Sequence, residues 1–264
     1  AVVVNNRNRV PAVDGRSAAE HVVDEIVAAG GRAVADHGDV SDPATAEALV
    51  AAALDTWGRL DICVTSAAVS SPELFHKTTP ENLARVIGIN VTGTALVASA
   101  ALRVMREADH GRIVLVASTA GLHGEPTVSA YAASKGAVIA LGRTAAVEGA
   151  RRGVLTNVLL PYATTQMTAE GMDPAFVEAM RPELVAPVVT ALADPDSTLN
   201  GQVIVAAGSG LRIADAVEGD TVRLPDDLTA ASLAELVDTS RSGRPHTYAH
   251  AQEAFQDFAA DLNA

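Results

Sequence analysis

The sequence of 264 residues has one cysteine, Cys63, and only 3% aromatic residues. A single cysteine excludes an internal disulfide and a cysteine-rich metal site, and it favours a reducing compartment, for which we expect the cytoplasm. We find no apolar run long enough to span a bilayer, so no membrane partner is expected. Because aromatics are scarce, Ala, Val and Leu must build the core, in line with a hydrophobic share of 48%.

Basic residues are also scarce. Lys and Arg number 19 against 32 Asp and Glu, which gives a formal net charge of −13 at pH 7. This charge argues against a nucleic-acid backbone or an anionic membrane as the main partner, since both would repel it. His246 and His250 share a helical spacing, but no clear third ligand accompanies them, so no metal site is predicted.

Short apolar runs alternate with longer helical patterns over the first 214 residues. The predicted strands cover 1–5, 32–36, 60–66, 111–118, 155–161 and 201–208. The predicted helices cover 17–29, 41–56, 79–105, 128–150, 173–180 and 182–193. This alternation, with continuously apolar strands, predicts a Rossmann-type doubly wound α/β fold whose parallel sheet is covered on both faces. Such a sheet binds ligands outside the carboxyl ends of its strands, where Ser118 and Pro161 stand.

The character of the sequence changes after residue 214. Residues 215–264 are polar and acidic and contain two segments with a helical pattern. We therefore expect a core domain over 1–214 and a helical extension over 215–264.

Tyr131 and Lys135 are four residues apart in the helix predicted over 128–150, so their side chains share one face. A free tyrosine titrates near ~10 and is a poor acid at neutral pH, but a neighbouring ammonium favours the phenolate and lowers its pKa. The pair then suits the protonation of an alkoxide or the deprotonation of an alcohol. Ser118 supplies a hydroxyl that can donate to a substrate carbonyl. A Tyr-x-x-x-Lys pair also occurs by chance in helices, so the surrounding sequence must decide whether this pair is catalytic.

Several longer segments resemble the classical short-chain dehydrogenase/reductases, and they occur in the order of that family. These segments are "HGDVSD", "GRLDICVTSAA", "IGINVTG", "GRIVLVASTAG" and "SAYAASKGA". The resemblance implies that Ser118, Tyr131 and Lys135 are catalytic, with Lys135 also binding the cofactor ribose. It implies that Asn90 holds a water molecule that relays protons to the lysine. It also implies contacts to a nicotinamide cofactor from Asp39, Val40, Ser66, Ala67, Ala68, Pro161 and Thr165.

A narrower likeness links the chain to the hydroxyacyl-CoA dehydrogenase unit of peroxisomal multifunctional enzymes and its bacterial relatives. The segments that carry it include "PYATTQMT", "AMRPELVAPVV" and "NGQVIVAAGSG". That subgroup oxidises 3-hydroxyacyl-CoA thioesters, so the likeness implies a small-molecule ketone or alcohol substrate, such as a 3-oxoacyl or 3-hydroxyacyl thioester. The family also implies a homodimer or homotetramer.

The residues after the first predicted strand bear on the choice of cofactor. In this fold a carboxylate at the end of the second strand binds the ribose of NAD and repels the 2′-phosphate of NADP. Asn6 stands there, with Arg7 and Arg9 close behind. Asparagine removes the repulsion, and a guanidinium suits a phosphate. We therefore expect NADP(H) rather than NAD(H), unless both arginines are solvated loop charges.

The family begins with a strand, a glycine-rich turn and a helix, whose backbone amides hold the pyrophosphate. These 264 residues hold no such unit, and their start matches the second strand of the family. We expect the unit to precede Ala1 in the complete protein; the alternative is that the protein lacks it. The family's Asn-Asn-Ala-Gly segment is also altered, to Thr65-Ser66-Ala67-Ala68. The second hypothesis is therefore a degenerate subunit, without activity, that scaffolds an active partner.

Overall fold

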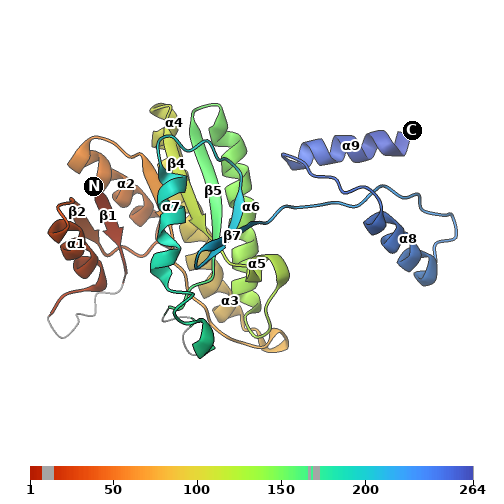
Figure 1. Cartoon of the computed structure of the whole chain (residues 1–264), viewed down its shortest axis with the longest axis horizontal. Helices are drawn as coiled ribbons and strands as arrows, with labels where there is room; N and C mark the ends of the chain where they lie inside the picture. The colour runs from red at the N-terminus through yellow and green to blue at the C-terminus, as the bar shows by residue number, and fades with distance from the viewer. Residues whose placement is uncertain (8–14, 166–167, 169–172, 264) are drawn as a thin grey trace. The chain divides into compact units, whose positions relative to one another are not determined.

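The computed structural model describes residues 1–7, 15–165, 168 and 173–263. The chain divides into two compact units, Ala1–Arg212 and Ile213–Ala264, close to the expected change of character after residue 214. The larger unit holds every residue of the predicted site (Figure 1). Each unit is described by itself below.

The larger unit contains two sheets (Figure 1). The smaller sheet joins β1 (Val2–Asn5) to β2 (Ala33–Asp36) in parallel. The larger sheet has the order β3-β4-β5-β6-β7, and β3 to β6 are parallel. Its strands are, in chain order, Ile62–Thr65, Gly111–Val116, Val154–Pro161, Val203–Ala207 and Gly210–Ile213. All the predicted strands are therefore found, and β7 is a further strand that the apolar pattern did not predict.

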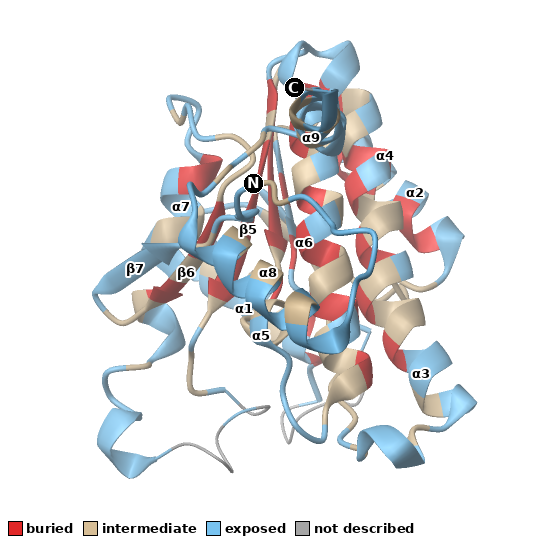
Figure 2. Ribbon diagram, turned by 90° about the vertical axis from the view of Figure 1, so that its right-hand side faces the viewer, coloured by how far each residue is buried: buried red, intermediate tan, exposed pale blue. Residues whose placement is uncertain are grey.

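Helices cover both faces of the larger sheet (Figure 2). The helices of this unit are α1 (Ala18–Ala28), α2 (Pro43–Trp57), α3 (Pro80–Ile87), α4 (Thr94–Glu107), α5 (Ala120–His123), α6 (Ser129–Ala150) and α7 (Ala186–Ala193). Short 3-10 turns occur at Phe75–Lys77, Pro174–Phe176 and Pro182–Leu184. Helices α4 and α6 pack on one face and α7 on the other, which confirms the doubly wound fold.

The side chains of the central strands alternate between the two faces of the sheet. Val114 and Leu159 pack in one apolar cluster that includes Leu192 of α7. Val158 points to the opposite face, where a Cβ on Gly142 of α6 would overlap it. Because both faces are buried, these strands are apolar at every position rather than at alternate positions.

Side-chain caps set the start of two helices. Ser17 and Glu20 each accept a hydrogen bond from the main-chain N–H of the other, which is a capping box at the start of α1. Asp42, rather than Ser41, caps α2 through its carboxylate. Both boundaries lie within one or two residues of the predicted ones, as expected for capped helices.

The helix predicted over 79–105 is one continuous run, Pro80–Glu107, in which a π-helical turn, η2 (Gly88–Gly93), separates α3 from α4. This run has 28 residues, and an 18-residue window within it has a mean hydropathy of 1.4, so it is long and apolar enough to cross a membrane by length and composition. The expectation that the sequence has no such run is therefore wrong. In this fold the run packs on α2, α6, β3 and β4 as a helix of the core.

The prediction of a helix over 173–180 is also wrong. The structure has the 3-10 turn Pro174–Phe176 followed by irregular turns, and Arg181 is extended with ψ at 137°. Pro182 disfavours helical backbone at Arg181. Pro174 and Pro182 leave a short segment between them. Forming the first turn of an α-helix orders several residues for one hydrogen bond, and a short segment gains few further hydrogen bonds to offset that cost.

No hydrogen bond joins the two sheets in the part of the chain that the structure describes. Within the described ranges, β1 pairs only with β2, and the only neighbour of β3 is β4. Helix α2 links the sheets, since it packs on β1 and on α4, which in turn packs on β3. Val2 of β1 and Ile62 and Val64 of β3 are exposed. One edge of β1 and one edge of β3 are therefore unpaired among the described residues.

The C-terminal unit contains α8 (Ala230–Ser242) and α9 (Ala251–Asn263), and neither helix has a buried residue in its described part. Carboxylates attach α9 to the rest of the unit: Asp257 accepts a hydrogen bond from Tyr248, and Asp261 accepts one from Thr221. The apolar side chains of α9 remain exposed; they are Phe255, Phe258 and Leu262. Polar contacts rather than apolar burial therefore hold this helix.

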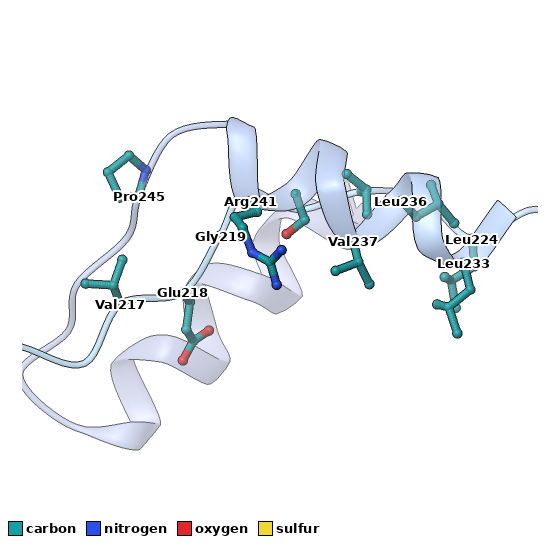
Figure 3. Close-up of a pocket in the computed structure, with 11 residues that line it drawn as sticks. Val217, Glu218, Gly219, Leu224, Leu233, Leu236, Val237, Arg241 and Pro245 are labelled. Atoms are coloured by element: carbon teal, nitrogen blue, oxygen red, sulfur yellow. The ribbon is translucent and has the colours of Figure 1, made fainter. Parts of the chain in front are cut away.

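A cavity of about 460 Å³ lies within the C-terminal unit, between α8 and the segment 217–224 (Figure 3). Its apolar lining consists of Val217, Val222, Leu224, Leu233, Leu236, Val237 and Pro245. Glu218 and Arg241 supply its charged groups. It contains none of the residues predicted for catalysis or cofactor binding, so the candidate site must be built from the strand ends of the larger unit.

Candidate active site

The predicted serine and tyrosine come from neighbouring strand and helix ends. Ser118 follows the last residue of β4 by two positions, and Tyr131 lies in the first turn of α6. The Ser118 hydroxyl is close enough to the Tyr131 phenol to lower its pKa, and its oxygen accepts a hydrogen bond from the Ala120 N–H at 3.2 Å. The structure thus brings together two side chains that are thirteen residues apart in the sequence.

Lys135 is buried, with 3% of its surface exposed. Its ammonium donates to the carbonyl oxygen of Val116 at 2.9 Å and lies 5.6 Å from the centre of the Tyr131 ring. Burial lowers the pKa of Lys135 to about 8, because the charged form is disfavoured away from water. Since Val116 is the last residue of β4, this hydrogen bond ties α6 to the carboxyl end of that strand.

The pKa of Tyr131 differs from the expectation. Burial raises this pKa above its ordinary value, and the hydrogen bond with Ser118 lowers it by less. The Lys135 ammonium is directed to the Val116 carbonyl and lies over the tyrosine ring rather than against the phenol oxygen. The predicted lowering of the Tyr131 pKa by Lys135 is therefore wrong for this arrangement, although the two side chains do share one helix face.

Asn90 lies in the π-helical turn η2 and is 1% exposed. Its side-chain oxygen accepts from the Val69 N–H at 2.8 Å. Its amide nitrogen donates to the Val69 carbonyl and to Ser134 Oγ, both at 2.9 Å. Both amide hydrogens are therefore used within the protein, so the predicted relay water would need another group of Asn90. The relay itself stays a prediction.

Ser134 is a residue of this site that the sequence reasoning missed. It is fully buried, and its hydroxyl donates to the main-chain carbonyl of Tyr131 at 2.7 Å. Its neighbours on the same helix face, Ala130 and Val138, are also buried. A hydroxyl placed between two buried apolar residues at helical spacing is the signal that could have found it, because buried polar groups need partners.

Two residues predicted for the adenosine end of the cofactor contact each other. Arg7 and Asp39 form an ion pair of 2.7 Å. Asp39 also accepts hydrogen bonds from the main chain and the hydroxyl of Ser41. The hydrogen bonds from Ser41, and then that from Arg7, lower the pKa of Asp39 to about 2. Val40 packs against Gly93 of η2, where a Cβ would come within 2.7 Å of it.

The other predicted cofactor residues all follow or end strands: Asn6 after β1, Ser66, Ala67 and Ala68 after β3, and Pro161 and Thr165 at the end of β5. Arg9 lies outside the described residues. Thr65, the last residue of β3, and Thr164, three residues after β5, carry buried hydroxyl oxygens that have no hydrogen-bond partner in the described part of the chain. Buried hydroxyls without a partner are uncommon, so each leaves a hydrogen-bonding group that the described residues do not satisfy.

The described residues contain no group of three or more His, Cys, Asp or Glu side chains placed to hold a metal ion. His246 lies near the carboxylates of Asp220 and Asp257, at 3.4 and 3.2 Å. The chemistry that this site can perform therefore depends on the serine, tyrosine and lysine and on what the strand ends bind.

Comparisons with known proteins agree with this geometry. The family profile described as short chain dehydrogenase matches residues 3–174. Over 208 residues the chain is 36% identical to the peroxisomal multifunctional enzyme type 2 of Drosophila melanogaster. The aligned region covers 78% of this chain and 34% of that protein. The chain thus spans about a third of the length of this relative.

Two solved structures are similar to most of this chain. A short chain dehydrogenase from Mycobacterium avium has a TM-score of 0.78 and 30% identity, covering 93% of this chain and 87% of that one. A gluconate 5-dehydrogenase from Burkholderia cenocepacia, solved in complex with NADP and tartrate, has a TM-score of 0.68 and 27% identity over 78% of this chain and 83% of that one. The family profile spans more than half of the chain and includes Asn90, Ser118, Tyr131 and Lys135. This chain therefore belongs to the short-chain dehydrogenase family.

Proposed function

We propose that the protein transfers a hydride between NADP(H) and a ketone or secondary alcohol, and that the substrate class is a 3-oxoacyl or 3-hydroxyacyl thioester. The observation that carries this proposal is the meeting of three side chains: Ser118 acts on the Tyr131 phenol and lowers its pKa, and the buried ammonium of Lys135 lies 5.6 Å from the centre of the Tyr131 ring. The likeness to peroxisomal multifunctional enzymes supports the thioester substrate.

The residues at the carboxyl ends of the strands fit a nicotinamide dinucleotide. The unpartnered hydroxyls of Thr65 and Thr164 offer buried hydrogen-bonding groups for its polar atoms. Lys135 would bind the hydroxyls of the nicotinamide ribose, and Arg7 would bind the 2′-phosphate. The cofactor supplies or accepts the hydride when it is bound. No glycine-rich turn is present in these 264 residues, so we assign no residue to the pyrophosphate.

The three catalytic side chains then divide the proton chemistry. The Ser118 hydroxyl polarises the substrate carbonyl by donating a hydrogen bond to its oxygen. Tyr131 delivers its phenolic proton to the same oxygen as negative charge develops there. Lys135, with a pKa of about 8, can lose and regain a proton near neutral pH, which suits it to restoring the proton that Tyr131 gives up.

Arg7 favours NADP(H) because its guanidinium is near the strand end where the adenosine is expected. In the structure it is paired with Asp39, and its side chain is 56% exposed. An exposed ion pair contributes little to the free energy of unfolding. Arg7 can therefore leave the Asp39 carboxylate and bind a ligand phosphate at little cost in free energy. The NADP bound by the gluconate 5-dehydrogenase supports the same choice by analogy.

The test is a fluorescence titration of the full-length protein with NADPH and, in parallel, with NADH. We expect tighter binding of NADPH and consumption of NADPH when a 3-oxoacyl thioester is added. Equal or tighter binding of NADH would overturn the cofactor preference. Failure to consume either cofactor with thioester and simple ketone substrates would overturn the proposed reaction.

A second candidate function is a subunit without activity that supports an active partner. The altered segment Thr65-Ser66-Ala67-Ala68 favours it. The same titration separates the two functions, because a scaffold need bind neither cofactor. Light scattering would test the homodimer or homotetramer that we propose for either function.

A further inference from the structure

We propose that Ser134 is a positioning residue for Tyr131, an inference that rests on the proposed function. The Ser134 hydroxyl joins the amide of Asn90 to the main-chain carbonyl of Tyr131, at 2.9 and 2.7 Å. All of this lies in the interior, since Ser134 is 0% and Asn90 is 1% exposed.

The direction of each hydrogen bond in this network is fixed by chemistry. The carbonyl of Tyr131 can only accept, so Ser134 donates its single proton to it. The hydroxyl oxygen must then accept from Asn90, whose orientation is set because the N–H and carbonyl of Val69 bind opposite ends of its amide. The chain Val69–Asn90–Ser134–Tyr131 therefore has one arrangement of protons. Such a fully satisfied network is rigid.

The network connects three separate segments of the fold. Val69 belongs to the loop after β3, Asn90 to the π-helical turn, and Ser134 to the catalytic helix α6. Ser134 lies three residues after Tyr131 and next to Lys135. A displacement of the π turn or the loop is thus transmitted directly to the first turn of α6.

Two other contacts hold the same part of α6. Lys135 donates to the Val116 carbonyl at 2.9 Å, which fixes the helix to β4. A Cβ on Gly121 of α5 would come within 2.5 Å of the Gly136 nitrogen, so the two backbones are already as close as they can be. The hydrogen bond between Ser134 and Asn90 is a further contact, and it fixes this part of α6 to the π-helical turn. Without it the start of α6 can shift away from Asn90, and the phenol can shift relative to Ser118.

The test compares Ser134→Ala, which removes the hydroxyl, with Ser134→Cys, which keeps a side chain of similar size and a weak donor. The matched control is Thr144→Ala, which removes an exposed hydroxyl from the far half of the same helix. We expect Ser134→Ala to lower kcat about 10- to 100-fold with KM unchanged, because small displacements of a proton donor are costly to catalysis. Ser134→Cys should fall between Ala and the wild type, and the control should match the wild type.

A second readout needs no cofactor or substrate. The phenol of Tyr131 is titrated by ultraviolet absorbance, as the difference between each protein and its Tyr131→Phe counterpart. Loss of the Ser118 contact would remove an effect that lowers the pKa of Tyr131. We therefore expect Tyr131 to ionise at a higher pH in Ser134→Ala than in the wild type, with Ser134→Cys between them.

An unshifted phenol titration in both Ser134 variants, or a wild-type kcat in Ser134→Ala, would overturn the positioning inference. If Ser134→Ala does not fold, Ser134→Cys alone decides by the same two readouts. If the wild type consumes neither cofactor, the proposed function fails, and the phenol titration still decides whether Ser134 positions Tyr131. The two failures are therefore distinguishable.

Discussion

The ammonium of Lys135 lies 5.6 Å from the centre of the Tyr131 ring, yet its hydrogen bond goes to the Val116 carbonyl at 2.9 Å. The helical spacing of four residues places the two side chains together. The carbonyl of Val116, at the end of β4, accepts the hydrogen bond that fixes the position of the Lys135 ammonium. As a result the phenol depends on its own burial and on Ser118 for its pKa. Each residue can therefore be tested separately.

Tyr131→Phe removes the phenolic hydroxyl, which is the proposed proton donor, and keeps the aromatic ring. We expect turnover to fall by about 10²- to 10⁴-fold, the usual contribution of a general acid, while NADPH still binds. Cofactor oxidation and fluorescence titration measure the two effects. Tyr248→Phe is the control, because Tyr248 lies in the C-terminal unit and bonds Asp257 there. Normal turnover in Tyr131→Phe would refute the catalytic assignment.

Lys135 makes stability depend on pH in the alkaline range. Its pKa is about 8 in the folded chain against an ordinary value of 10.5, so between these values the unfolded chain binds more protons at this lysine. The Lys135 contribution to the free energy of unfolding should therefore rise with pH across this window, by about 3 kcal/mol in total, while the raised pKa of Cys63 opposes it above pH 9. Urea unfolding at several pH values would show the slope in the wild type and its loss in Lys135→Met. The exposed Lys77 supplies the control, since Lys77→Met should keep the slope.

Arg7→Ala should weaken NADPH binding about tenfold and leave NADH binding unchanged, because only NADPH has a 2′-phosphate for the guanidinium to bind. Titrations of both cofactors at two salt concentrations measure this, and the difference should shrink at high salt. Arg59→Ala is a matched control, since Arg59 is also an exposed arginine paired with an aspartate, Asp61. Equal losses for the two cofactors would instead indicate that Arg7 acts only through its ion pair with Asp39.

Gly121 tests how closely α5 must approach the catalytic helix. Its Cβ in Gly121→Ala would come within 2.5 Å of the Gly136 nitrogen and 2.6 Å of the Lys135 carbonyl carbon, both of them backbone atoms. We expect the free energy of unfolding to fall by about 1–3 kcal/mol. Gly88→Ala is the opposite case, because its Cβ meets nothing within 4 Å, and helical Gly→Ala changes stabilise by about 0.5–1 kcal/mol. Thermal unfolding of both variants would show whether the signs differ.

The sequence predicted those features that depend on local patterns. Continuous apolar runs located the strands, and the spacing of Tyr131 and Lys135 placed both on one face of α6. Features that depend on long-range contacts were missed. The π turn around Asn90 leaves no periodic signal, and the link from Ser134 to Asn90 spans 44 residues. The sign of the Tyr131 pKa shift was also missed, because it follows from burial rather than from the neighbouring lysine.

The unpaired edges of β1 and β3 have a consequence for handling the protein. Each edge offers a row of main-chain donors and acceptors, flanked by the exposed side chains of Val2, Ile62 and Val64. Such rows can template pairing with an identical row on another molecule, and charged side chains are the usual protection against it. For a protein that consists of these 264 residues alone, we therefore expect self-association through these edges at high concentration, which light scattering would show.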